Sequence, residues 1–79
     1  MIHELKTLPQ YFSMSAEGKK NFEVRRNDRD FKVGDFVFLR EYSGDRYTGR
    51  EWHRKIDYIL YGGQLGIESG YCILSLSEV

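Results

Sequence analysis

Cysteine and proline are almost absent from this sequence, which contains one of each, Cys72 and Pro9. A single cysteine cannot form an intramolecular disulfide, and no cysteine and histidine pair has the spacing of a zinc site, so we expect neither a metal nor a cofactor. No apolar run approaches the roughly 18 residues of a membrane span, and the first residues lack the regions of a signal peptide. These absences predict one cytoplasmic domain over residues 1–79, with no membrane partner.

Net charge is absent as well, because 12 basic residues balance 12 acidic ones. The charges are unevenly distributed: residues 18–55 carry seven arginines and four lysines against seven acids, a net charge of +4. A locally basic middle can attract phosphate, but the interleaved acids make this attraction far weaker than that of a true basic patch.

Short runs of aromatic and branched residues are what the sequence does contain, and they predict strands. The expected strands cover residues 3–8, 21–26, 36–42, 50–61 and 71–76. One helix is expected over residues 9–17, where Pro9 suits the first turn and Gly18 the end. A helix of about two turns is not stable alone, so it must lie against the body of the protein.

The pattern predicts a mainly β fold with one short helix, an α+β protein. We expect five or six short strands, mostly antiparallel and closed into a small β-barrel, because closure removes exposed strand edges. Strand 36–42 is expected at the centre, and the last strand could pair with the first. Residues 43–49 predict a long, exposed hairpin loop, and Gly34 predicts a tight turn.

Alternation on the longest strand, residues 50–61, divides its side chains between two faces. The apolar face is expected to carry Trp52, Ile56, Tyr58 and Leu60. Core packing is the expected role of Trp52 and Tyr58.

The best candidate for a site is the segment of residues 18–25. If residues 21–26 form a strand, Phe22 and Val24 share one face while Glu23 and Arg25 share the other. Lys20, just after the turn, could reach the side of Glu23 and Arg25 and complete an array of cation, anion and cation. The alternative is a solvated strand face with ordinary surface ion pairs.

Outside this segment the signals are weaker. His3 and His53 lack metal-type neighbours, and Cys72 lies in an apolar strand where packing is its expected role. Arg46 and Tyr47, in the glycine-flanked loop, are the most accessible candidates to stack on the bases of a single strand.

Gly18, Lys20, Glu23 and Arg25 form a pattern, G-x-K-x-x-E-x-R, that resembles the motif of the ASCH domain family, a branch of the PUA-like β-barrels. The similarity covers roughly residues 2–76 and extends to small ASCH-like proteins of bacteria and their phages. It implies a closed PUA-like barrel in which the motif lines a cleft for RNA or a nucleotide-like ligand, with Gly18 and Gly34 as structural residues.

The resemblance also implies an enzymatic alternative. Some small members of the family hydrolyse acylated cytidine nucleosides with a threonine nucleophile, and others are ribonucleases. Here Glu23 occupies the position of that threonine, while Lys20 lies where the catalytic lysine lies, so these two residues are the catalytic candidates. We expect an RNA- or nucleotide-binding module using Lys20, Glu23, Arg25, Arg46 and Tyr47. A hydrolase of a modified nucleoside or RNA, a protein-interaction module and weak self-association remain open.

Overall fold

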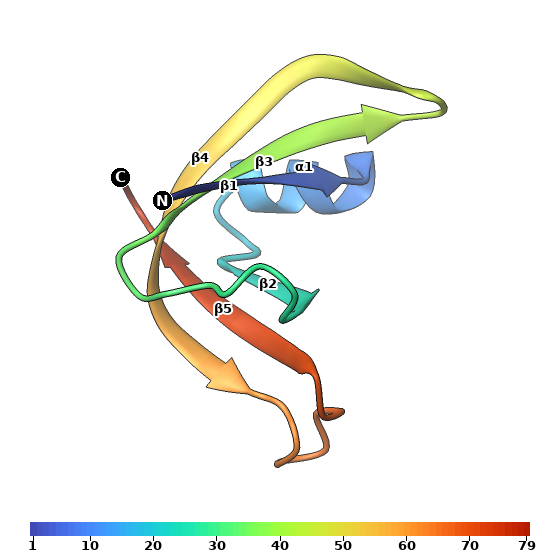
Figure 1. Cartoon of the computed structure of the whole chain (residues 1–79). Coiled ribbons are helices and arrows are strands. Elements are labelled where there is room, and N and C mark those ends of the chain that lie inside the picture. The colour runs from blue at the N-terminus through green and yellow to red at the C-terminus, as the bar shows by residue number, and fades with distance from the viewer.

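Five strands form one sheet, and a single helix packs against it (Figure 1). The computed structural model describes all residues 1–79. The elements in chain order are β1 (Ile2–Thr7), α1 (Pro9–Ala16), β2 (Phe22–Arg26), β3 (Phe36–Ser43), β4 (Arg46–Tyr61) and β5 (Tyr71–Ser77). The prediction of a mainly β protein with one short helix is confirmed.

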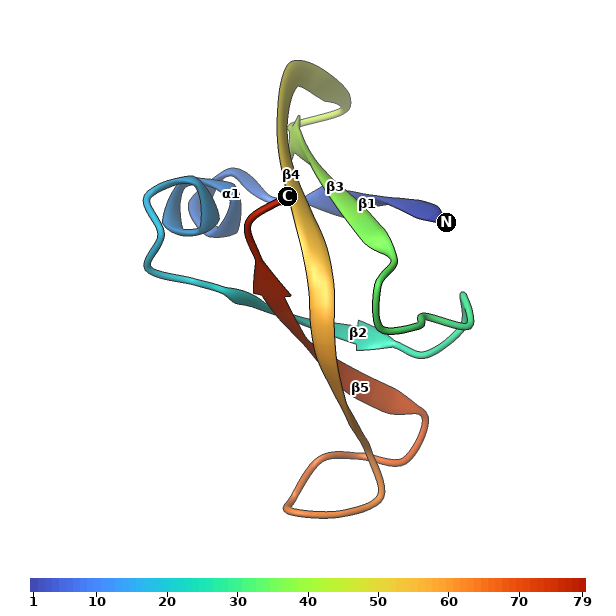
Figure 2. The same ribbon diagram turned by 90° about the vertical axis from the view of Figure 1, so that its left-hand side faces the viewer.

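The sheet is open, with the strand order β1-β3-β4-β5-β2. β1 pairs with β3 in parallel, and every other pairing is antiparallel. The expected closure into a barrel is therefore wrong, as is the pairing of the last strand with the first, because β5 has β4 and β2 on its two sides. β4, rather than β3, is the central strand. Figures 1 and 2 show β1 and β2 as separate edge strands of a curved half-barrel.

β4 is long because the β3–β4 hairpin is tight. Only Gly44 and Asp45 separate the two strands, so the expected loop over residues 43–49 is mostly strand. A bulge shifts the register between Arg40 and Tyr42, where β4 contributes more residues than β3. Bulges bend a strand and increase its twist, and β4 curves along its length in Figure 1.

A second irregularity in β4 changes which side chains lie on its buried face, so the apolar face predicted from alternation over residues 50–61 is partly wrong. The register against β5 shifts between Ile56 and Tyr58, so Ile56 and Ile59 are the buried residues. Tyr58 is exposed instead of packing in the core, because the extra residue turns it to the other face. Trp52 does pack against the core, partly buried.

The sequence explains both ends of α1. Pro9 occupies its first turn, and the chain leaves it through Gly18 at φ 80°. The N–H of Gly18 donates to Ser15 O at 3.1 Å and that of Lys19 to Met14 O at 3.0 Å. These two bonds form the Schellman motif expected of a glycine cap. The helix packs on β3 and β4 through buried Phe12 and Ser15.

The hydrophobic core lies on the concave face of the sheet. Ten buried residues form it: Leu5, Phe12, Phe31, Val37, Leu39, Ile56, Ile59, Cys72, Leu74 and Leu76. Alternate residues of β1, β3 and β5 supply most of this set, as expected for strands with one covered face. Only two of the 12 aromatic residues belong to it, so many rings lie at the surface.

Side chains bridge the seam between the edge strands β1 and β2, where no backbone ladder forms. Arg25 donates from Nη2 to the carbonyl oxygen of Lys6 at 2.9 Å, and Arg29 from Nη1 to that of Glu4 at 2.9 Å. Both acceptors are carbonyl groups of β1 that point away from β3. Successive residues of a strand direct their backbone groups to opposite sides, and the residues that alternate with these two bond to β3. Arg25 on β2 and Arg29 in the segment after β2 thus bind this part of the chain to the free edge of β1.

The turn before β3 contains Gly34, at φ 97°, as predicted. Its neighbour Asp35 accepts a bond from the N–H of Lys32 at 3.1 Å and lies 2.8 Å from Nε2 of buried His3. His3 is therefore a satisfied core histidine that connects β1 to this turn.

The one helix of the fold is neither long nor apolar enough to cross a membrane.

Candidate functional site

Lys20, Glu23 and Arg25 converge on one point. Lys20 Nζ donates to Glu23 Oε2 at 2.5 Å, while Nε and Nη2 of Arg25 lie 2.9 and 2.8 Å from Oε1. Glu23 is only 3% exposed. The array is therefore a partly buried ionic cluster, and the alternative of a solvated strand face is wrong.

Alternation along β2 positions this cluster. Glu23 and Arg25 pair with Leu74 and Cys72 of β5 on the concave side, whereas Phe22 and Val24 point outward and are exposed. The charged face of the strand is thus the covered one. Such an inversion places polar groups where a folded chain normally buries apolar ones, and it needs internal partners for every charge.

The turn after α1 supplies the third member. The N–H of Lys20 donates to Met14 O at 3.1 Å, and Asn21 Nδ2 donates to Gly18 O at 2.9 Å, which fixes the reversal of the chain. The ammonium of Lys20 then reaches back to Glu23 and also donates to Phe22 O at 2.8 Å. The left-handed conformation of Gly18 is therefore part of how the site is built.

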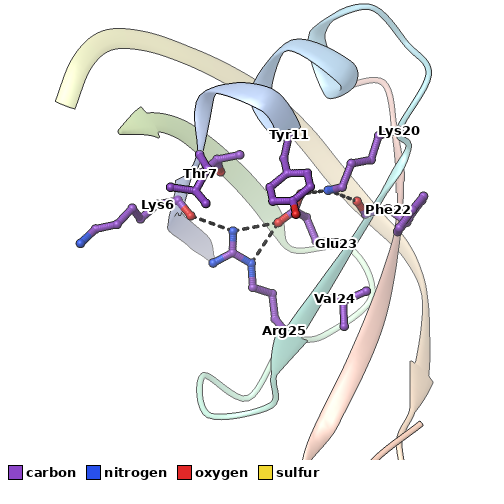
Figure 3. A pocket seen from close by; sticks show the side chains of 9 residues that line it. Lys6, Thr7, Tyr11, Lys20, Phe22, Glu23, Val24 and Arg25 are labelled. Carbon is purple, nitrogen blue, oxygen red and sulfur yellow. Dashed lines mark hydrogen bonds and ion pairs between the residues drawn. The ribbon is translucent and has the colours of Figure 1, made fainter. Parts of the chain in front are cut away.

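These three residues line a cleft of about 560 Å³ at the seam between β1 and β2. The lining consists of Lys6, Thr7, Leu8, Tyr11, Lys20, Phe22, Glu23, Val24 and Arg25. In Figure 3, Lys20 and Arg25 approach Glu23 from opposite sides, and the ring of Tyr11 comes in from α1. The Lys6 ammonium points away and lies 4.2 Å from the ring of Tyr42, so only the two motif cations serve the cleft.

The cleft combines a net charge of +1 with aromatic walls. Two cations face one carboxylate, and hydrogen-bond donors of both remain free: Nη1 of Arg25 has no partner, and Lys20 uses two of its three N–H groups. Lys20 Nζ lies 5.8 Å from the ring centre of Tyr11 and 5.1 Å from that of Phe22. An anion bound at the cations would therefore lie beside two accessible rings.

The structure does not bring Arg46 and Tyr47 to this cleft. Both lie at the β3–β4 hairpin, far from β2 in Figure 1. Tyr47 packs edge-on against Tyr42, at 5.0 Å between ring centres, and the Arg40 guanidinium lies 4.0 Å from its ring. Arg46 is 80% exposed. Spacing in the sequence could not separate these two residues from the site, because only the tertiary fold shows that the hairpin points away.

Sequence reasoning missed the wall that β1 and α1 contribute. Thr7 is the last residue of β1, Leu8 follows it, and Tyr11 lies in the first turn of α1. Thr7 Oγ1 donates to Leu5 O at 3.1 Å, so its proton is bound to the backbone rather than to a base. The available signal was Tyr11 in the first turn of the helix, about two turns before the glycine cap, on a helix too short to bury every apolar side chain.

Arg26 ends β2 and lies on its outward face, with its guanidinium carbon 5.6 Å from the ring of Tyr71. It forms no ion pair or hydrogen bond, unlike its neighbour Arg25. The two adjacent arginines therefore differ fully in environment.

The remaining polar candidates form no second reactive centre. No group of three or more histidine, cysteine, aspartate or glutamate side chains could hold a metal ion. Burial raises the pKa of the Cys72 thiol, which packs in the core and is a poor nucleophile there. His53 is at the surface, stacked on Phe38 at 3.7 Å and 3.0 Å from Oε1 of Glu51.

Comparison with known proteins gives two results. Over residues 2–76 the sequence matches the model of a family described as a domain of unknown function, DUF3850. It is also 40% identical, over 55 residues, to a protein of Escherichia phage P2 described as "Uncharacterized 12.9 kDa protein in GpA 3'region". The match covers 70% of this chain and 50% of the phage protein, so the chain spans about half the length of that relative. A phage relative agrees with the bacterial or phage type expected from the sequence.

Proposed function

The chain belongs to the DUF3850 family, and we propose that in this member the cleft between β1 and β2 binds a nucleotide or a short nucleotide-like segment of RNA. Lys20 and Arg25 meet the phosphate, Glu23 holds the two cations in place, and Tyr11 and Phe22 contact the base.

One observation carries this proposal, the buried Glu23 carboxylate that holds two cations at the floor of a cleft. The bonds from Lys20 and Arg25, 2.5 to 2.9 Å long, fix both cations before any ligand arrives. Side chains already held in their binding geometry lose little further entropy on binding. The free Nη1 of Arg25 and the third N–H of Lys20 can donate charge-assisted hydrogen bonds to phosphate oxygens.

The aromatic residues favour a nucleotide over a bare phosphate. Tyr11 and Phe22 are 47% and 45% exposed, so both rings are accessible to a ligand in the cleft. Stacking on an aromatic ring contributes about 1–3 kcal/mol per base. A cleft of about 560 Å³ falls within the range of small-ligand sites.

The charge balance favours a short ligand over a long strand. The chain has no net charge, and the cleft itself carries a net +1. A long polyanion would meet the interleaved acids of residues 18–55, while one nucleotide would meet only the cleft.

The resemblance of Gly18, Lys20, Glu23 and Arg25 to the ASCH motif supports the same proposal. The usual proposal for ASCH domains is RNA or a nucleotide-like ligand in a cleft lined by this motif. We infer that the chain is an ASCH-like, PUA-related protein whose barrel remains open at the seam.

The test measures binding of a mononucleotide by NMR titration across a salt series. We expect a shallow salt dependence, corresponding to about one or two displaced counterions, and at least a tenfold loss of affinity in Lys20→Ala and in Arg25→Ala. The matched controls are Lys19→Ala and Arg26→Ala, which remove the neighbouring cations that lie outside the cleft. Equal losses in the controls, or a steep salt slope with affinity that keeps rising up to RNAs of roughly ten nucleotides, would refute the cleft proposal.

The same mixtures test the enzymatic alternative when they are analysed for product. Release of product from an acylated nucleoside or from RNA, abolished in a folded Lys20→Ala variant, would assign a hydrolase instead. If the protein neither binds the nucleotide nor releases product, a protein-interaction module would be favoured.

A further inference from the structure

A second cavity, of about 360 Å³, adjoins the proposed nucleotide cleft on the outer face of the sheet. Val24, Gly66, Ile67, Glu68, Tyr71 and Ile73 line it. Val24 lines both cavities, so the two meet across the exposed edge of β2. We propose that this second cavity receives the second base of a ligand two nucleotides long, preferably a base with an exocyclic amino group. This inference rests on the proposed function.

The second cavity has the surface that a base requires. Val24 pairs with Ile73, and Arg26 with Tyr71, so their side chains stand together on the outward face of β2 and β5. Val24 is 53% exposed although it is apolar. Tyr71 provides a ring, and Ile67 and Ile73 provide apolar surface beside it. Bases stack well on a ring bordered by apolar side chains.

Arg26 supplies the cation for the phosphate that would join the two nucleosides. It follows Val24 by two positions on the same face, about 7 Å along the strand. Its guanidinium lies 5.6 Å from the Tyr71 ring and has no anionic partner, although eight ion pairs of the fold include an arginine or a lysine. An unpaired arginine beside a ring can meet phosphate and stack at once.

Glu68 gives the second cavity a preference among bases. Glu68 belongs to the lining, and its carboxylate forms no hydrogen bond or ion pair within the fold. A carboxylate only accepts hydrogen bonds, so it favours the amino groups of adenine or cytosine over the carbonyl oxygen that uracil presents. It also repels further phosphates, which limits the ligand to a short segment.

The experiment compares three ligands, the mononucleotide pA and the dinucleotides pApA and pApU, each with a 5′-phosphate for Lys20 and Arg25. We expect pApA to bind about tenfold more tightly than pA, with a smaller gain for pApU. Arg26→Ser and Tyr71→Ala should each abolish most of the gain while leaving the affinity for pA unchanged. Glu68→Gln should reduce the difference between pApA and pApU. Because Tyr71 is partly buried, the exposed Arg26→Ser variant tests the inference independently of folding.

The outcomes separate the two proposals. If pA binds and depends on Lys20, but pApA binds no more tightly, the second cavity is not a base site and the proposed function stands. A gain for pApA that persists in both Arg26→Ser and Tyr71→Ala also overturns the inference, because the second base then lies elsewhere. Absence of any nucleotide binding overturns the proposed function, and this inference with it.

Discussion

Glu23 is the residue on which the candidate site depends, because it separates two cations that would otherwise repel each other. Its carboxylate is buried, whereas the side chains of Lys20 and Arg25 are 18% and 26% exposed. A buried carboxylate is stable only while its partners remain in place, and the partners keep their geometry only while the carboxylate is charged. The three side chains therefore behave as one unit.

We expect Glu23→Gln to lower the free energy of unfolding by about 2 kcal/mol. Loss of one member of a buried ion pair costs about 3–5 kcal/mol, and the partial exposure of both cations reduces that cost. Urea unfolding monitored by fluorescence measures it. Glu17→Gln is the control, since its pair with Lys19 is at the surface and should contribute less than about 0.5 kcal/mol. If Glu23→Gln and Glu17→Gln are equally stable, the Glu23 carboxylate does not stabilise the fold through Lys20 and Arg25.

The lowered pKa of Asp35 predicts how the free energy of unfolding depends on pH. The hydrogen bond with His3, followed by those from the Lys32 N–H and the amino terminus, holds the pKa of Asp35 below its ordinary value of 3.8, although burial opposes them. Because the pKa is lowered in the folded state, this stabilisation is complete above pH 3.8 and is lost as pH falls through the folded pKa.

Urea unfolding of the native protein and of Asp35→Asn, between about pH 2 and 5, checks this expectation. The variant should be less stable at pH 5, and the difference should shrink as the pH falls. Asp45→Asn, in the exposed hairpin, should show no such change. A difference for Asp35→Asn that is constant with pH would contradict the assignment.

At the scale of elements, two glycines are needed for different physical reasons. Gly18 has φ 80°, yet a Cβ atom there would meet nothing within 4 Å. Gly62 has an ordinary φ, but a Cβ atom there would clash with the carbonyl oxygen of Glu68. Conformation therefore requires the first glycine, and lack of space requires the second.

We expect Gly18→Ala to cost about 1 kcal/mol, the usual penalty for a left-handed alanine. Gly62→Ala should cost more, because backbone atoms must move. Gly18→Asn should recover part of the loss, since asparagine tolerates this conformation. Thermal unfolding of the three variants measures the order of their stabilities. A larger loss for Gly18→Ala than for Gly62→Ala would contradict this explanation.

The sequence predicted the elements best where one residue carried a local signal. Pro9 and Gly18 bounded the helix, and the spacing of Phe22 and Val24 indicated which face of β2 bears the charges. The two bulges of β4 were not predictable, because each depends on the partner strand across the ladder and leaves little mark on a single strand. The β1 wall of the cleft was missed for the same reason: it comes from pairing with β3.

At the scale of the whole molecule, the seam between β1 and β2 replaces barrel closure. A closed barrel was predicted because exposed edges invite association. The structure meets the same need differently, with Arg25 and Arg29 bonded to carbonyl groups of the β1 edge. Strand patterns cannot reveal this solution, since it uses side chains instead of a ladder.

Arg29→Ala should loosen the seam without unfolding the protein. It removes one hydrogen bond to Glu4 O, worth about 1 kcal/mol. We expect faster hydrogen exchange of the His3 and Leu5 amides in β1, with exchange in β4 unchanged. Arg46→Ala, which removes an arginine with no contact to β1, is the control. Unchanged exchange in β1 would show that the arginine does not hold the edge.

Every residue that lines the nucleotide cleft falls between positions 6 and 25, yet three other strands set the distance between its two walls. β3, β4 and β5 stand between β1 and β2 in the sheet, and the bulges of β4 help determine how far the sheet curls. The ligand-contacting surface and the width of its opening are therefore encoded in different parts of the chain. Two relatives with identical lining residues can thus select ligands of different size, by changing only the curvature of a strand that no ligand touches.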